Sequence, residues 1–121
     1  SATLIAGRKY TGELVLKCVN TTAAEGIAID FVGGNATMTS FAAGAGVLTG
    51  GTTVAVTTVS SALATDFDWS TITGETWITF RFTLVVNAAG TFIPRFREST
   101  AHTSGTATIN LGSYMWLEDT P

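Results

Sequence analysis

Few side chains in this sequence are of the types that do chemistry, and their spacing favours no catalytic centre. His102 is the single histidine, and no G-x-S-x-G motif is present to supply a serine nucleophile for it. Cys18 is the single cysteine and lies far from His102 in the chain, so the two cannot supply the three or four ligands of a zinc site. Asp66 and Asp68 lack the ligand spacing of a calcium loop. We therefore expect no catalytic residue, no metal and no other cofactor.

A binding role, if the domain has one, would depend on polar and aromatic side chains. The stretch Ser99 to Gly105 is expected to be a loop whose hydroxyl and imidazole groups suit sugar hydroxyls, and a tryptophan could stack on a sugar ring. Candidate recognition residues are His102, Thr100, Thr103, Ser104, Trp69 and Trp116. The same residues could instead contact another subunit, or, for the tryptophans, fill the core. The Gly-rich stretch Ala42 to Thr53 is expected to be a second long loop, with a brief strand at its middle.

The composition indicates more apolar surface than one small core can hide. Hydrophobic residues make up 45% of the 121 residues and charged residues 12%, whereas charged residues are about 25% of an ordinary soluble protein. The surplus is expected on a surface rich in small residues or in contact with other subunits. The net charge is −3 and no basic stripe is present, so nucleic-acid binding is not expected. No apolar run reaches the roughly 18 residues of a membrane span, so no span is expected.

A long alternating run, Thr76 to Val86, is expected to be the central strand of the fold. Its inward residues would be Ile78, Phe80, Phe82, Leu84 and Val86. We expect this strand to form a hairpin with Thr91 to Arg97, through a loop in which Gly90 takes a positive φ angle. Pro94 cannot donate a ladder hydrogen bond, which predicts an edge position or a bulge in the return strand.

Similar patterns elsewhere bring the expected total to about eight strands, and no segment has the sustained pattern of a helix beyond one possible turn in Ser60 to Ser70. Further strands are expected at Tyr10 to Val19, Ile27 to Val32, Ala36 to Phe41, Val54 to Val59, Thr106 to Leu111 and Ser113 to Glu118. The first of them turns Leu14, Leu16 and Cys18 inward, which makes Cys18 a core residue rather than a reactive thiol. The fold class is therefore all-β, an antiparallel β-sandwich or jelly roll. It is expected to be one domain over residues 1–121, or the C-terminal part of a longer protein.

The segment Phe82 to Phe96, FTLVVNAAGTFIPRF, followed by Gly112-Ser113-Tyr114-Met115, resembles the C-terminal β-domain of tailed-bacteriophage virion proteins. Such domains occur in fibres, tail-needle knobs and capsid decorations, and are similar to the trimeric jelly roll of the tumour-necrosis-factor and C1q families. The resemblance implies a TNF/C1q-like homotrimer. It also implies a non-enzymatic structural domain of the virion that attaches the particle to a host surface, or caps or decorates it. Partners would be further copies of the chain, other virion proteins, and a host-surface glycan or protein.

The resemblance also places the strand around Pro94 near subunit contacts. Candidate interface residues are Arg95, Phe96, Arg97 and Glu98. The related sequences usually have Gln or Ser after the proline, so arginines close to a three-fold axis would need carboxylate partners from neighbouring subunits. The alternative function is that of a carbohydrate-binding β-sandwich module of a secreted bacterial protein, with one tryptophan as its stacking surface.

Overall fold

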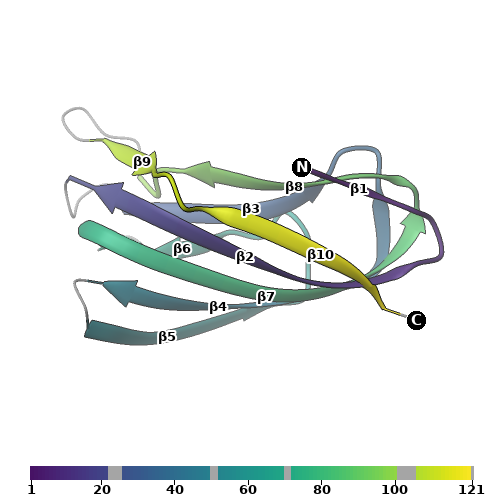
Figure 1. Cartoon of the computed structure of the whole chain (residues 1–121), viewed down its shortest axis with the longest axis horizontal. Helices are drawn as coiled ribbons and strands as arrows, with labels where there is room; N and C mark the ends of the chain where they lie inside the picture. Colours follow the sequence, from purple (N-terminus) through teal and green to yellow (C-terminus); the bar gives the residue numbers. More distant parts are fainter. Residues whose placement is uncertain (22–25, 50–51, 70–71, 101–105, 121) are drawn as a thin grey trace.

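Two antiparallel β-sheets pack face to face in the computed structural model of the chain (Figure 1). The structure describes residues 1–21, 26–49, 52–69, 72–100 and 106–120, with the backbone alone for residues 49 and 52–59. These residues form ten strands and no helix. The expected all-β sandwich is therefore confirmed.

The smaller sheet has four strands and the larger sheet has six. The smaller sheet has the order β1 (Ala2–Leu4), β8 (Gly90–Arg97), β3 (Ile27–Gly33), β6 (Phe67–Trp69). The larger sheet has the order β10 (Tyr114–Thr120), β2 (Lys9–Asn20), β7 (Gly74–Ala88), β4 (Thr37–Thr49), β5 (Thr52–Ser60), and β9 (Ala107–Ile109) also pairs with β2. In Figure 1 the long strands of the larger sheet run side by side, in the order β10, β2, β7, β4 and β5 from top to bottom.

The first eight strands pair in a nested order. β4 pairs with β5, β3 with β6, β2 with β7, and β1 with β8. These are the pairings of one long hairpin whose two arms meet at the short connection between β4 and β5. The hairpin is folded so that its strands divide between the two sheets. Strands β9 and β10 then extend the larger sheet beside β2.

The core lies between the sheets and follows the period-two pattern of the sequence. The five inward residues predicted for the central strand are each 2% exposed or less, which confirms the assignment of its faces. Leu14, Leu16 and Cys18 of β2 are also buried, as predicted. Burial raises the pKa of the Cys18 thiol to about 12, so the thiol stays protonated and unreactive near neutral pH.

The predicted hairpin between β7 and β8 is wrong, because the two strands belong to different sheets. Only Ala89 separates them, so the chain turns a corner of the sandwich as a nearly continuous strand. Gly90 does not take a positive φ angle. A glycine is needed there because a Cβ atom would collide with the backbone of Asn35 and Ala36.

Pro94 has the edge position that was predicted. β1 covers β8 only from Gly90 to Phe92, so among the described residues the part of β8 that contains Pro94 is paired with β3 alone. Because no described strand pairs with β8 on the β1 side at Pro94, the missing amide hydrogen of the proline removes no ladder hydrogen bond on that side.

The predicted Gly-rich loop is also wrong, since its described residues, 42–49 and 52–53, belong to β4 and β5. Alanines and glycines alternate along β4 in a period of two, with Ala43 and Ala45 buried and Gly46 exposed. The register with β5 shifts between Ala45 and Val47, where three residues of β5 lie opposite Gly46 alone. Small side chains hid a strand pattern that larger residues would have made plain.

Gly12 provides a test of the packing between the strands. A Cβ atom at Gly12 would lie 2.5 Å from the carbonyl oxygen of Trp116 and 2.6 Å from the ring of Phe82, whereas a Cβ atom at Gly46 meets no atom within 4 Å. We expect Gly12→Ala to lower the free energy of unfolding by about 1–3 kcal/mol, because the core must shift to accept the methyl group. Gly46→Ala is the matched control and should leave stability nearly unchanged. Urea denaturation of both variants measures the difference, and equal midpoints would contradict the packing described.

Candidate functional site

The outer face of the smaller sheet carries two of the predicted interface residues. Ile29, Phe31 and Phe92 point into the core, so their neighbours in sequence point outward. We call this the small-sheet face; its outward positions are Ala28, Asp30 and Val32 on β3 and Ile93, Arg95 and Arg97 on β8, of which Ala28 and Asp30 are buried. These residues form cross-strand pairs, Ala28 with Arg97, Asp30 with Arg95, and Val32 with Ile93.

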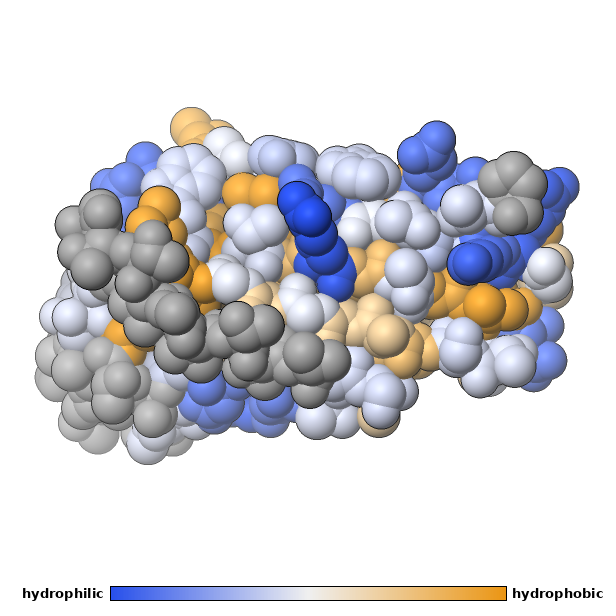
Figure 2. All heavy atoms as spheres, turned by 90° about the horizontal axis from the view of Figure 1, so that it is seen from below, coloured by the Kyte–Doolittle hydropathy of each residue, from blue (hydrophilic) through white to orange (hydrophobic). Residues whose placement is uncertain are grey.

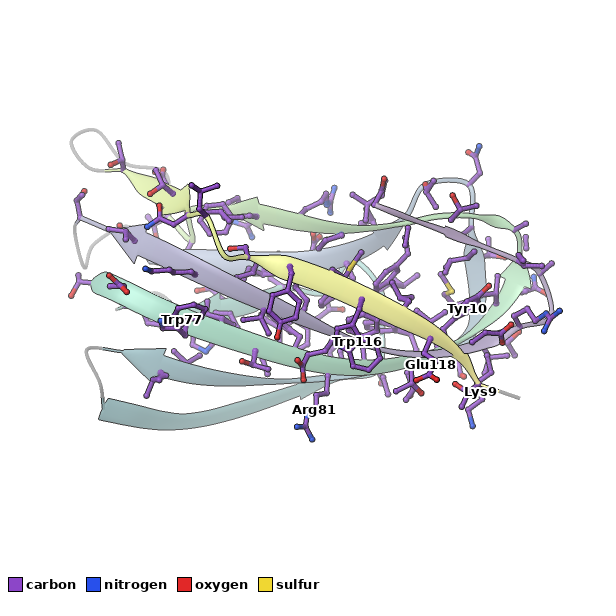
Figure 3. All side chains as sticks on the ribbon, in the orientation of Figure 1. Lys9, Tyr10, Trp77, Arg81, Trp116 and Glu118 are labelled. Atoms are coloured by element: carbon purple, nitrogen blue, oxygen red, sulfur yellow. The ribbon has the colours of Figure 1, made fainter. Side chains whose placement is uncertain are left out.

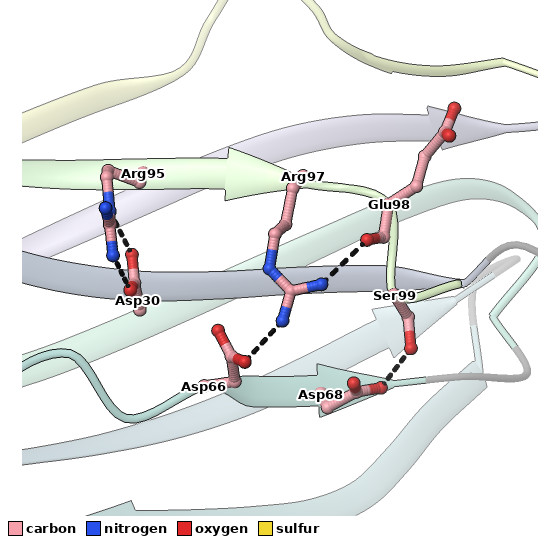
Figure 4. A network of polar contacts seen from close by, with 7 residues as sticks. All are labelled: Asp30, Asp66, Asp68, Arg95, Arg97, Glu98 and Ser99. Carbon is pink, nitrogen blue, oxygen red and sulfur yellow. Dashed lines mark hydrogen bonds and ion pairs between the residues drawn. The ribbon is translucent and has the colours of Figure 1, made fainter. Parts of the chain in front are cut away.

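Both arginines of the small-sheet face pair with carboxylates of the same chain (Figure 4). Arg95 donates two parallel hydrogen bonds to Asp30, and the one from its Nε is 2.8 Å long. Asp30 is 7% exposed, and the hydrogen bond to it raises the pKa of Arg95. Arg97 pairs with Asp66 and donates to the carbonyl oxygen of Glu98 at 3.1 Å. A neighbouring subunit is therefore not required to supply carboxylates for these arginines.

The other two predicted interface residues lie elsewhere. Phe96 is half-buried and packs against the core. The side chain of Glu98 accepts a hydrogen bond from the backbone amide of Ala107 at 3.3 Å, which ties the end of β8 to β9. Of the four candidates, only Arg95 and Arg97 belong to the small-sheet face.

The predicted recognition residues are dispersed. His102, Thr103 and Ser104 lie outside the described residues, and Thr100 is exposed. Trp69 is 5% exposed and its ring stacks on Phe67, so it belongs to the core and offers no stacking surface. Trp116 is 43% exposed on β10.

A second surface lies on the outer face of the larger sheet and is centred on Arg81 (Figure 3). Three adjoining hollows of about 370, 290 and 240 Å³ share this side chain as a wall. We call it the Arg81 surface; it consists of Thr11, Glu13, Gly44, Gly46, Thr79, Arg81, Thr83 and Trp116. Figure 2 looks at the molecule from the side toward which Arg81 points in Figure 3, and shows charged side chains standing over pale and apolar atoms.

The hollows form because glycines without side chains on β4 lie beside large side chains on the neighbouring strands. Gly44 pairs with Arg81, and Gly46 pairs with Thr79, so β4 supplies a floor without side chains beside β7. On the other side Arg81 pairs with Glu13, which in turn pairs with Trp116. One row across four strands therefore runs from an open floor to a large exposed ring.

The polar groups of the Arg81 surface are held by each other. Oε1 of Glu13 accepts a hydrogen bond from the hydroxyl of Tyr114 at 3.4 Å, and Oε2 lies 3.6 Å from Nε of Arg81. The Arg81 side chain is 87% exposed, so most of its guanidinium faces solvent. Sequence alternation places Arg81 on the outer face, but it gives no signal that Gly44 and Trp116 lie beside it.

Trp77 shares this face but is partly covered. Nζ of Lys17 lies 5.6 Å from the centre of its ring, in a cation–π contact. The same ammonium pairs with Glu75 at 3.1 Å. Trp77 is 36% exposed, and one side of its ring is therefore already occupied.

The part of the chain that the structure describes holds no group of three or more His, Cys, Asp or Glu side chains placed to bind a metal ion. In the same residues no helix is long and apolar enough to cross a membrane. Comparisons of this chain with protein-family models, curated proteins and solved structures find no match.

Asp30 and Asp66 allow the buried and the exposed ion pair to be compared. Asp30→Ala removes the carboxylate that accepts two hydrogen bonds from Arg95, and the side chain of Asp30 is 9% exposed. The substitution should lower the melting temperature by roughly 4 °C or more. Asp66→Ala removes a carboxylate that is 39% exposed, where solvent screens the pair, and should have a smaller effect. Differential scanning calorimetry of the two variants decides. A larger drop for Asp66→Ala would show that burial does not set the strength of these pairs.

Proposed function

We propose that this chain is a non-enzymatic bacteriophage virion domain with a jelly-roll fold, which assembles as a homotrimer and attaches the particle to a host surface, or caps or decorates it. The observation that carries the proposal is the nested pairing of β1 to β8, with sheet orders β1-β8-β3-β6 and β2-β7-β4-β5. A nested order of this kind is expected of a jelly roll, an architecture used by viral capsid and lectin domains, and it supports the proposal. The resemblance of Phe82 to Phe96 to phage virion domains points the same way.

The small-sheet face supports assembly. Its charges are already matched within the chain, because Asp30 binds Arg95 through two hydrogen bonds and Arg97 pairs with Asp66. A neighbour that covered this face would bury hydrogen-bonded pairs rather than single charges, which lowers the cost of desolvation. Val32 and Ile93 add an apolar pair that is only half-buried in the single chain. A stable trimer needs well over about 1,000 Å² of buried surface at each contact.

Multi-angle light scattering tests the assembly. The wild-type protein should have three times the 12.6 kDa mass of the chain at micromolar concentration. Ile93→Glu should dissociate it, because an unpaired carboxylate would be buried in the contact. Thr83→Glu adds the same charge at an exposed position of the larger sheet and should leave the trimer intact. A wild-type mass of 12.6 kDa would overturn the proposal, and dissociation by Thr83→Glu alone would assign the contact to the other face.

A further inference from the structure

The three hollows of the Arg81 surface adjoin one another in a row that forms a shallow depression across the larger sheet. The first and second hollows share Gly44, the second and third share Thr11, and all three share Arg81. The depression therefore crosses from β4 over β7 to β2 and ends at Trp116 on β10. Ligand pockets range over about 300–1,000 Å³. The first hollow lies at the lower end of this range, and the other two lie just below it. Because the depression is open and crosses several strands, its shape suits an extended ligand better than a compact one.

Trp116 is the one tryptophan of the chain that is placed to stack on a ligand. Trp69 is enclosed in the core, and Lys17 covers one side of Trp77. The ring of Trp116 lines the third hollow together with Glu13 and Arg81, and 43% of the residue is exposed. An indole ring in this position offers a flat apolar surface beside hydrogen-bonding groups. The C–H face of a sugar ring and its hydroxyl edge match these two features.

The polar groups beside Trp116 can serve both roles in hydrogen bonding. Arg81 supplies donors only, Glu13 supplies acceptors only, and the hydroxyls of Thr79 and Thr83 can do either. The hydroxyl of Thr11 is already paired with that of Thr120 at 3.3 Å. Tyr114 holds Glu13 in place through one carboxylate oxygen, which leaves the other oxygen toward Arg81. A donor and an acceptor held side by side match adjacent hydroxyl groups of one sugar, each of which both donates and accepts.

The charges on this face balance, which indicates an uncharged ligand. Three positive side chains, Lys9, Lys17 and Arg81, stand on the outward positions of β2 and β7. Three negative side chains, Glu13, Glu75 and Glu118, stand on the outward positions of β2, β7 and β10. The neighbouring strand β5 has no charged residue in its sequence. A strongly anionic or cationic ligand would be repelled by side chains of the same charge within this surface.

We infer that the Arg81 surface binds a neutral oligosaccharide, with Trp116 stacking on one sugar ring and with Arg81 and Glu13 bonding to its hydroxyls. The depression toward Gly44 and Gly46 holds the next sugar units. Oligosaccharide binding would supply the host-surface ligand of the proposed attachment role. Only this biological use of the binding rests on the proposed function. Binding at the Arg81 surface also leaves the small-sheet face to assembly, since the two surfaces lie on opposite sides of the sandwich.

The probe is a glycan array of short neutral oligosaccharides of glucose, galactose and mannose, with sialylated and uronic-acid oligosaccharides alongside. The wild-type protein should bind neutral members of the array. Trp116→Ala should weaken this binding roughly tenfold or more, because the stacking ring is lost. Gly46→Val should weaken binding by filling the first hollow, and its side chain has open space in the unliganded protein. Trp77→Ala is the matched control, and it should retain binding while removing an exposed tryptophan of the same sheet face.

Three results would overturn the inference. They are no binding of wild-type protein to any neutral oligosaccharide, unchanged binding by Trp116→Ala, and a loss in Trp77→Ala as large as in Trp116→Ala. Binding confined to the acidic oligosaccharides would overturn the assignment to a neutral ligand. Thermal melting of each variant verifies that it is folded. Light scattering on the same samples separates the two proposals, because a monomer that binds sugar contradicts only the trimer, and a trimer that binds none contradicts only this site.

Discussion

The packing of Phe31 between the two sheets is the interaction on which the rest of the structure depends. Phe31 lies on β3 of the smaller sheet, and its ring meets Phe80, Phe82 and Phe41 of the larger sheet at centroid distances of 5.2, 5.5 and 5.8 Å. Within its own sheet it stacks on Phe92 at 5.3 Å. A single cysteine excludes a disulfide within the chain, so the sheets are held by side-chain packing of this kind.

This aromatic layer also decides what the outer faces present. Side chains alternate along a strand, so a residue that joins the layer fixes its two neighbours on the outside. Phe80 and Phe82 of β7 thereby hold Arg81 outward, and Phe31 of β3 holds Asp30 and Val32 outward. The two faces then differ in character. The small-sheet face carries ion pairs closed within the chain, whereas the Arg81 surface carries an open floor, an exposed ring and a largely exposed guanidinium.

The sequence predicts the class of fold and the inner faces of the strands with large side chains. The pattern from Ile78 to Val86 is long and regular, so its inward set was identified correctly. The partner of a strand is harder to predict. The single residue Ala89 between β7 and β8 is as compatible with a corner as with a tight hairpin, and both strands alternate in either case. The glycines of β4 favoured a loop because the pattern of hydrophobicity fades when inward residues are as small as Ala43.

The candidate sites were harder still to predict. The roles of Trp69 and Trp116 depend on which strand each joins, and no local signal separates the buried ring from the exposed one. The Arg81 surface combines Glu13, Gly44, Arg81 and Trp116 from four strands, and only the strand register brings them together. The ion pair of Asp30 with Arg95 likewise joins β3 to β8 across 65 residues of sequence, and that of Asp66 with Arg97 spans 31 residues. Sequence alternation predicts such residues as outward but not as neighbours.

The central claim is that the small-sheet face is covered in the assembled protein and the Arg81 surface is free. Labelling of single cysteines by a maleimide tests it directly, with Ile93→Cys reporting on the first surface and Gly46→Cys on the second. The wild-type protein serves as a blank, because Cys18 is 0% exposed and its pKa is raised to about 12. We predict fast labelling of Gly46→Cys and slow labelling of Ile93→Cys at concentrations where the trimer forms. Fast labelling of Ile93→Cys in the assembled protein, or protection of Gly46→Cys, would contradict the account.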